Sequence, residues 1–444
     1  MTQTRADVPE RFRLSLTDEL FMHIDKPASP FSVQLELRVN QRLDAQKLAG
    51  ALLTASTLHP MARVALAPYK PSDKFYVWEQ AELLDYIPLQ ERECSSEEDL
   101  DLARSELHSA SVSLEQAPPF RCLLVHTDGG DYVMINMSHA VSDGVGEYRF
   151  LTSVMRAYAG VPDPQPALDF ISARDLSGLF GSRKLRERLN RITRLLEILG
   201  TAITPPARIA KDGDSQQGGV AFVPVRFSEQ ETARLHTLRS GQSTLNDVLI
   251  ALLHQAIARW NRAHGQKDGR ISVMMPMNAR PNEWRHELVS NLSLWVNVIS
   301  RPEHQGNFSS LLEVVSKQTR NLKDRGTAGL LVDLLHEIRG LPVWIKQALP
   351  SLLPLSGHRI VDTTVLNNLG RLPPILPAEN SLKITEAWFS SPCRLPMGLS
   401  VGAATLDDQL RLSFRYSLRQ FDREGAWAFV ENFLDGLAAE LAIQ

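Results

Sequence analysis

The distribution of apolar and polar residues along the first third of the chain predicts strands and helices in a regular order. Val33 to Val39, "VQLELRV", alternates apolar and polar residues and predicts a half-exposed strand. The stretch 42–60 then has apolar residues at helical spacing, with Asp44 placed to cap the helix. "RCLLVHT" and "DYVMINMS" flank a "DGG" turn and predict a hairpin that ends at Ser138. Gly144 to Tyr158 returns to helical spacing.

The pattern changes after residue 163 and begins a second cycle at residue 220. "SRKLRERLNRITRLLEIL" predicts a basic, solvated helix, and the Pro-, Gly- and polar-rich stretch that follows it predicts a linker. The second cycle again mixes strands with long helices, and Ser243 or Thr244 is expected near the start of the longest one. The expected units are an N-terminal lobe (1–165), a linker or crossover region (166–219) and a C-terminal lobe (220–444).

Strands and helices occur in both halves, but they do not alternate strictly. This pattern predicts an α/β fold with mixed sheets. A chain of 444 residues is too long for one compact core, so two domains or two large lobes are expected.

Composition and charge exclude several classes of protein. The formal net charge of -3 gives no basic field that would attract nucleic acid. Cys94, Cys122 and Cys393 lie far apart without CxxC spacing, so we expect no metal site and no disulfide framework, as in a reducing cytoplasm. The polar N-terminus lacks a signal-peptide core, and no run of about 18 apolar residues predicts a membrane span. We therefore expect a cytoplasmic protein.

The stretch from Ala328 to Leu355 is the most lipid-like part of the sequence. Charged residues and prolines interrupt its apolar residues. We favour an amphipathic helix pair packed on the core. The alternative is a surface element that touches lipid or a long acyl chain, so peripheral lipid contact stays open.

Candidate chemistry is concentrated in "HAVSDG", which spans His139 to Gly144 between the predicted strand and the predicted helix. An imidazole can take up a proton near neutral pH without a metal. Asp143 is close enough to brace the turn, and Gly144 permits a backbone geometry that a side chain would block. Ser142 lacks the G-x-S-x-G context of a hydrolase nucleophile. The pattern favours a general base acting without a covalent enzyme intermediate, although six residues alone are also compatible with a structural histidine.

This stretch resembles the HxxxDG signature of an acyltransferase superfamily. The superfamily includes chloramphenicol acetyltransferase, plant alcohol acyltransferases, condensation domains of peptide synthetases, bacterial wax ester synthases and polyketide-associated acyltransferases. Other segments are similar in the same order: "LSLTDELFMHIDKPASPFSVQLEL", "STLNDVLIALLHQAIARW", "MPMNARP", "LNNLGRL" and "LRLSFRYSLRQFD". Together they cover most of the chain. The resemblance implies two chloramphenicol-acetyltransferase-like lobes that form a pseudo-dimer with a substrate tunnel between them.

The resemblance also implies roles for individual residues. His139 would take the proton from an acceptor alcohol as it attacks an acyl thioester, and Asp143 would act as a structural brace paired with Arg280. Gly144 completes the catalytic turn with His139 and Asp143. Residues expected to bind the substrate are Ser142, Asn278, Arg280, Asn368 and Gly370. For Asn278, Asn368 and Gly370 a purely structural role in a loop or turn is equally compatible with the sequence.

Three functions remain open at this stage. The first is transfer from acyl-CoA to an alcohol, with the thioester as co-substrate and no other cofactor. The second uses a thioester bound to an acyl or peptidyl carrier protein, or an amine acceptor. The third is a non-catalytic binding protein, because Ser138 stands where condensation domains and wax synthases usually carry a first histidine.

Overall fold

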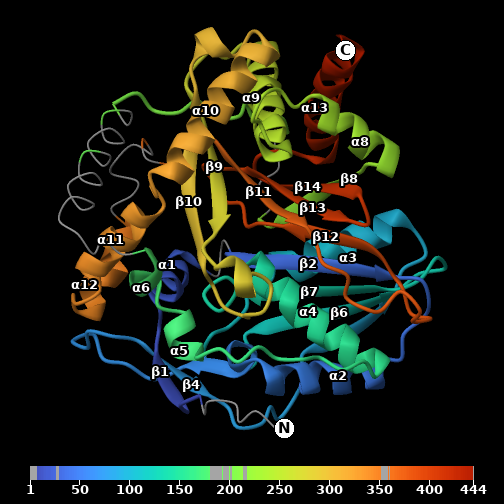
Figure 1. Ribbon diagram of the computed structural model, residues 1–444, viewed down its shortest axis with the longest axis vertical. Coiled ribbons are helices and arrows are strands. Elements are labelled where there is room, and N and C mark those ends of the chain that lie inside the picture. Colours follow the sequence, from blue (N-terminus) through green and yellow to red (C-terminus); the bar gives the residue numbers. More distant parts are fainter. Residues whose placement is uncertain are drawn as a thin grey trace.

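The computed structural model describes residues 8–26, 30–180, 193, 200, 203–213, 218–351, 359 and 361–443. It has two stacked lobes, each built on a mixed sheet (Figure 1). Helices cover the lower sheet from below and the upper sheet from above. The α/β class with mixed sheets is confirmed.

The lower lobe contains a five-stranded sheet in the order β12-β2-β7-β6-β5. Only β5 and β6 run parallel. Its strands are β2 (Ser32–Val39), β5 (Leu89–Glu93), β6 (Phe120–His126), β7 (Tyr132–Ser138) and β12 (Ile384–Ser390), and its helices are α2 (Ala45–Leu58), α3 (Glu97–Ser109) and α4 (Gly144–Ala159). All of β7 is buried, and it ends where the candidate histidine begins. The predicted hairpin of β6 and β7 and the Asp44 cap of α2 are both present.

The upper lobe contains a six-stranded sheet in the order β10-β9-β11-β13-β14-β8. Its strands are β8 (Val220–Arg226), β9 (Ile271–Asn278), β10 (Ser293–Ser300), β11 (Thr364–Arg371), β13 (Leu399–Leu406) and β14 (Gln409–Ser417). Its helices are α8 (Glu229–Thr237), α9 (Leu245–Ala263), α10 (Phe308–Asp324) and α13 (Arg423–Ile443), with short 3-10 turns η2 (Asn282–Trp284) and η3 (Pro302–His304). Thr244 caps α9 through a capping box with Asp247, and it is one of the two residues expected near the start of this helix.

A third region flanks both lobes. It contains a small sheet of β1 (Arg11–Arg13), β4 (Val77–Gln80) and β3 (Val64–Leu66), with η1 (Pro60–Arg63), α1 (Leu16–Ile24), α5 (Phe170–Ala173), α6 (Leu176–Phe180), α11 (Gly329–Ile338) and α12 (Val343–Ala348). The last two are a pair of helices within 328–355, as expected, but only α11 turns a purely apolar side to the protein, because α12 buries Lys346 together with Val343. Val332 and Val343 are buried, whereas Trp344 is exposed.

One strand of the lower sheet comes from the C-terminal half of the chain. Strand β12 comes from the C-terminal half of the sequence, yet it pairs antiparallel with β2 from Ile384 opposite Val39 to Ser390 opposite Gln34. The boundaries predicted at residues 165 and 219 stay a prediction, and the basic stretch 182–199 lies almost entirely outside the described residues. Within the described residues, no helix is both long enough and apolar enough to cross a membrane.

Candidate active site

The candidate histidine lies in a tight turn between β7 and α4. Asp143 is the N-cap of α4, and its Oδ1 accepts a hydrogen bond from the Gly146 amide at 2.9 Å. The cap ends the turn and fixes the direction in which the helix leaves the sheet. His139 is held one residue beyond the buried strand and is only 7% exposed.

One ring nitrogen of His139 is bound to the backbone, and the other is left free. Nδ1 lies 3.0 Å from the carbonyl oxygen of Ser142. Asn291 Nδ2 lies 3.3 Å from the same nitrogen, but it donates to the His139 carbonyl oxygen at the shorter distance of 2.5 Å. Because a carbonyl oxygen only accepts hydrogen bonds, the closer contact with Ser142 places the hydrogen of the neutral imidazole on Nδ1 and the lone pair on Nε2. No hydrogen bond from the described residues to Nε2 is present, and His139 lines a cavity. The arrangement suits a general base.

Aromatic rings cover one side of the imidazole. Phe21 of α1 stacks on His139 with ring centres 4.0 Å apart, and Phe31 lies 5.8 Å away. Burial lowers the pKa of His139 to about 4, although the Ser142 carbonyl and the Asp143 charge act in the opposite direction. His139 is therefore neutral at neutral pH and can accept a proton there.

Asp143 is bound from both lobes. Its Oδ2 accepts hydrogen bonds from Arg280 Nη1 and from the Leu292 amide, both at 2.8 Å. Arg280 also donates to the carbonyl oxygens of Leu288 and Ser290, at 3.0 and 2.7 Å. The expected Asp143–Arg280 pair is thus present, and it joins the motif turn of the lower lobe to the segment after β9.

The segment 288–292 also holds the backbone of the histidine. Asn291 Nδ2 donates to the His139 carbonyl oxygen at 2.5 Å. The Asn291 carbonyl in turn accepts from Thr17 Oγ1 at 2.7 Å, which connects α1 to the same point. The sequence analysis did not identify Asn291, because "SNL" matches no motif and its contact spans 152 positions.

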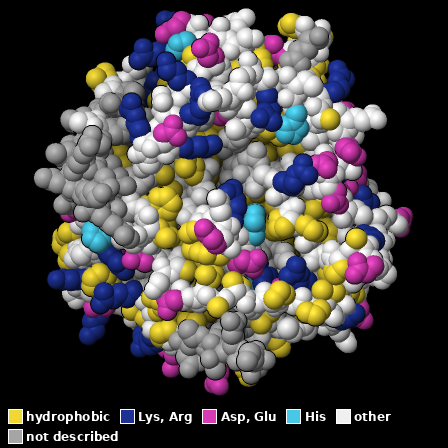
Figure 2. Space-filling view, viewed as in Figure 1, with side chains coloured by type: hydrophobic (Ala, Val, Ile, Leu, Met, Phe, Trp, Pro, Cys, Tyr) yellow, Lys and Arg dark blue, Asp and Glu magenta, His cyan; other side chains and the backbone are white. Residues whose placement is uncertain are grey.

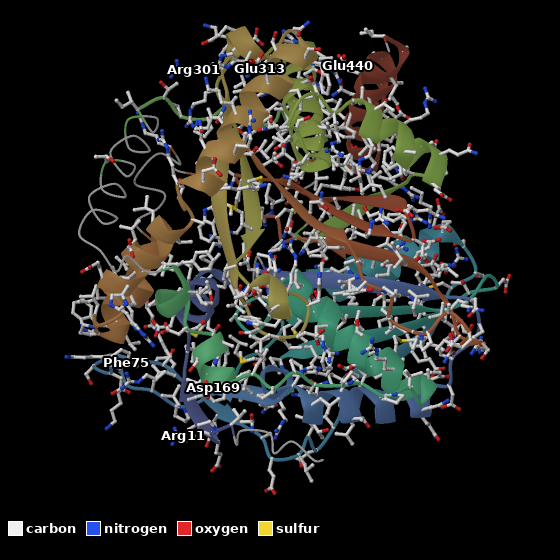
Figure 3. The ribbon with its side chains drawn as sticks, in the orientation of Figure 1. Arg11, Phe75, Asp169, Arg301, Glu313 and Glu440 are labelled. Atoms are coloured by element: carbon white, nitrogen blue, oxygen red, sulfur yellow. The ribbon has the colours of Figure 1, made fainter. Side chains whose placement is uncertain are left out.

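A cavity of about 410 Å³ opens at His139 and continues into the upper lobe. It is lined by polar and apolar residues from β9, β10 and β11, from the ends of α4, α9 and α10, and from the neighbouring loops: His139, Asp143, Gly144, Val145, Thr244, Asn246, Met275, Pro276, Met277, Asn278, Arg285, Ser293, Lys323, Asn367, Asn368, Leu369 and Gly370. Figure 2 shows a hollow near the centre of the viewed face, between the helices of the upper lobe and the lower sheet. Figure 3 places Arg301, Glu313 and Glu440 on the outer end of the upper lobe, away from this centre.

Six of the residues expected at the site lie on this cavity: His139, Asp143, Gly144, Asn278, Asn368 and Gly370. Ser142 and Arg280 do not line it. Ser142 is fully buried, and its hydroxyl donates to the Asp143 carbonyl oxygen at 3.1 Å. Their expected roles in substrate binding stay predictions.

Two of the lining residues have evident structural requirements as well. A Cβ atom on Gly144 would come within 2.4 Å of Phe389 and 2.9 Å of Leu369, so β11 and β12 approach the helix start too closely for a side chain. Gly370 has a positive φ of 77° in the bulge of β11, and its amide donates to Asn368 Oδ1 at 2.8 Å.

The cavity carries positive charge. Arg285 and Lys323 are both exposed, and no carboxylate of the described residues lies within ion-pair distance of either. Among the same residues, no group of three or more His, Cys, Asp or Glu side chains could hold a metal ion. Two unpaired cations beside a buried imidazole suit an anionic ligand that reaches toward His139.

The chain matches the family model of the condensation domain over residues 20–337. It is 33% identical to the uncharacterized protein Rv2305 of Mycobacterium tuberculosis over 98% of this chain and 100% of that protein. Among solved structures, it resembles the first condensation domain of the calcium-dependent antibiotic synthetase with a TM-score of 0.69 and 15% identity, over 97% of this chain and 96% of that one. It also resembles TRI3 trichothecene 15-O-acetyltransferase from Fusarium sporotrichioides, with a TM-score of 0.68 and 12% identity, over 98% and 95% of the chains.

Proposed function

Because the chain belongs to the condensation-domain family, we propose that it is an acyltransferase that moves an acyl group from a thioester, most simply acyl-CoA, to an alcohol. The observation that carries this proposal is the free Nε2 of a neutral His139 on a cavity lined by both lobes. The reaction requires the imidazole and the two substrates, with no further cofactor.

In the proposed reaction, Nε2 of His139 takes the hydroxyl proton of the acceptor as its oxygen attacks the thioester carbonyl carbon. The C–O bond forms and a tetrahedral oxyanion results. The C–S bond then breaks, and the imidazolium returns the proton to the departing thiolate. Such positioned proton transfer contributes about 10²–10⁴-fold in rate, and holding both substrates at His139 lowers the entropic barrier further.

Asn368 is our candidate for stabilising the oxyanion. Its Oδ1 is occupied by the Gly370 amide, which orients the side-chain amide on the cavity wall. A fixed donor aimed at the developing charge lowers the barrier more than a mobile one.

The cations at the cavity are suited to the thioester. CoA and carrier proteins both present a phosphopantetheine arm, whose phosphate could pair with Arg285 and Lys323. This shared chemistry leaves two donors, acyl-CoA and an acyl-carrier protein. It also leaves two acceptors, an alcohol or an amine. Incubating the protein with each donor against panels of alcohols and amines, and identifying the product by mass spectrometry, separates these reactions.

Ser138 stands at the position of the first histidine of the family motif, and this position does not face the cavity. Ser138 is fully buried and does not line the cavity, and within the described residues its hydroxyl accepts a hydrogen bond only from the Ala140 amide. This placement favours a catalytic protein over a binding protein of the same fold. Location in the cytoplasm, expected from the thiols and the polar N-terminus, stays a prediction.

The proposal is tested with His139→Ala and, as a matched control, His236→Ala on the exposed surface of α8. We expect release of free thiol from the thioester in the presence of acceptor to fall by about 10²–10⁴-fold in His139→Ala and to be unchanged in His236→Ala. Both variants should keep the circular dichroism spectrum of the wild type. Equal turnover by His139→Ala contradicts the proposal.

A further inference from the structure

One corner of the molecule exposes large aromatic side chains. Helix α12 packs against the turn 71–73, where Trp344 N donates to the Pro71 carbonyl at 3.1 Å and Val343 N to the Asp73 carbonyl at 2.8 Å. Val343 is buried by this contact, but Trp344 is 58% exposed. Tyr69, whose hydroxyl accepts from Gln347 of α12 at 3.0 Å, is 40% exposed. These contacts fix the aromatic groups in place without covering them.

Cations surround the aromatic groups. The Arg13 guanidinium lies 4.1 Å from the ring centre of Phe75, and that of Arg339 lies 5.9 Å from it. Lys70 and Lys74 flank the turn that α12 packs against. Figure 3 labels Phe75 at this edge of the molecule, and Figure 2 shows Lys and Arg side chains interspersed with hydrophobic ones there.

These cations form no ion pair with the described part of the chain, although Arg339 interacts electrostatically with Glu19 over a longer distance. None of Arg13, Lys70, Lys74 and Arg339 lies within ion-pair distance of a described carboxylate. The nearby Asp73 is already used in its own turn, where Oδ2 accepts from the Lys70 amide at 2.7 Å. The corner therefore combines unpaired positive charge with exposed aromatic rings.

We propose that this corner, defined as Arg13, Tyr69, Lys70, Lys74, Phe75, Arg339 and Trp344, binds the surface of a membrane that contains anionic lipids. Trp and Tyr rings favour the level of the lipid headgroups, and Lys and Arg are attracted to anionic headgroups. Val343 and Lys346 anchor α12 on the protein, Lys346 through its ion pair with Glu19, and this leaves Trp344 on the outward side of the helix. An acidic protein is the competing occupant, because Trp and Arg are also enriched at protein interfaces, and the vesicle experiment below separates the two.

A second cavity lies beside this corner. It measures about 470 Å³, and Tyr69 of the corner lines it. Its other walls are mixed, and they include Met22, His23, Asp25, Lys26, Tyr76, Glu115 and Gln347. The Tyr76 hydroxyl and His23 Nε2 are buried, and neither has a hydrogen-bond partner among the described residues. Helix α1 forms one wall of this cavity, and its Phe21 stacks on His139. Helix α1 therefore contributes both to this cavity and to the surroundings of the candidate base.

Membrane binding does not depend on acyl transfer, so it can be tested without turnover. The full chain is sedimented with vesicles of phosphatidylcholine alone and of phosphatidylcholine with phosphatidylglycerol, at low and high salt. We expect binding only to the vesicles with phosphatidylglycerol, and weaker binding at high salt. Absence of sedimentation with anionic vesicles overturns the proposal. If the protein then binds an acidic protein, the corner is a protein-binding surface.

The responsible surface is identified with two pairs of variants. Trp344→Ala should lower the partition coefficient several-fold, whereas the matched Trp427→Ala, 41% exposed on α13, should not. Lys70→Glu with Lys74→Glu should lower it by at least about 25-fold, since each neutralised charge is worth about fivefold at an anionic surface. Lys267→Glu with Lys317→Glu, two exposed lysines of the upper lobe, is the control. Equal losses in a variant pair and its control overturn the assignment to this corner.

Discussion

Replacing Asp143 by alanine should destabilise the protein strongly, because the carboxylate connects the two lobes. It accepts hydrogen bonds from the backbone amides of Gly146 and Leu292 and from Nη1 of Arg280. Most of the loss comes from Arg280, because its side chain is 0% exposed and its unpaired charge would stay out of contact with water. Removing one member of a buried ion pair costs about 3–5 kcal/mol.

The structure places the expected loss within that range. Arg280 would retain three neutral acceptors, the carbonyl oxygens of Leu288 and Ser290 and Oδ1 of Asn278. These bonds satisfy the guanidinium but do not neutralise it, so the loss should lie near the lower end, at about 3 kcal/mol. Adding Arg280→Met to Asp143→Ala should recover part of it, because the unpaired charge is then gone.

The assay is urea-induced unfolding followed by circular dichroism. The control is Glu106→Ala, which removes one partner of the Arg92–Glu106 pair at 2.6 Å, where the glutamate side chain is 59% exposed. Such a surface pair contributes about 0–1 kcal/mol. A loss in Asp143→Ala no larger than that in Glu106→Ala would refute the reasoning, as would a further loss on adding Arg280→Met.

Three further variants probe the site. Burial, and next the charge of Asp143, raise the pKa of Glu147 well above its usual value, so the folded state binds an extra proton and its stability falls as pH rises above about 4.5. The melting temperature of Glu147→Gln should therefore rise relative to that of the wild type between pH 5 and pH 8, and a difference that stays constant over this range contradicts the reasoning. Gly144→Ala should lose about 1–3 kcal/mol through overpacking against Phe389, measured against Gly50→Ala on α2, where a Cβ atom meets nothing within 4 Å. Arg285→Glu with Lys323→Glu should raise KM for the acyl thioester more than it lowers kcat, with Lys267→Glu unchanged; equal KM values would remove both residues from the thioester site.

The sequence predicted the elements whose signals are local. Asp44 and Thr244 cap the helices expected to begin there, and the hairpin of β6 and β7 follows from its "DGG" turn. Helix α1 was not predicted, although Ser15 and Asp18 form a capping box that the sequence displays. The pairing of β12 with β2 has no local signal, because a strand's partner is chosen by packing across hundreds of residues.

The same distinction applies to the site. His139, Asp143 and Gly144 could be identified because one turn holds all three, and Arg280 followed from the resemblance. Asn291 and Phe21 could not be, since each reaches His139 only through the tertiary fold. The depressed pKa of His139 likewise depends on burial by residues from α1, which no spacing within the motif encodes.

The pH dependence of kcat/KM for acyl transfer tests the central claim most directly. If His139 is the base and burial holds its pKa at about 4, kcat/KM should be constant from pH 8 down to about pH 5 and fall only below it, as the imidazole takes up a proton. Circular dichroism at each pH checks that the fold is intact. A fall centred near pH 6.5 or above, or the same profile and rate in His139→Ala, would contradict a buried, neutral His139 acting as the general base.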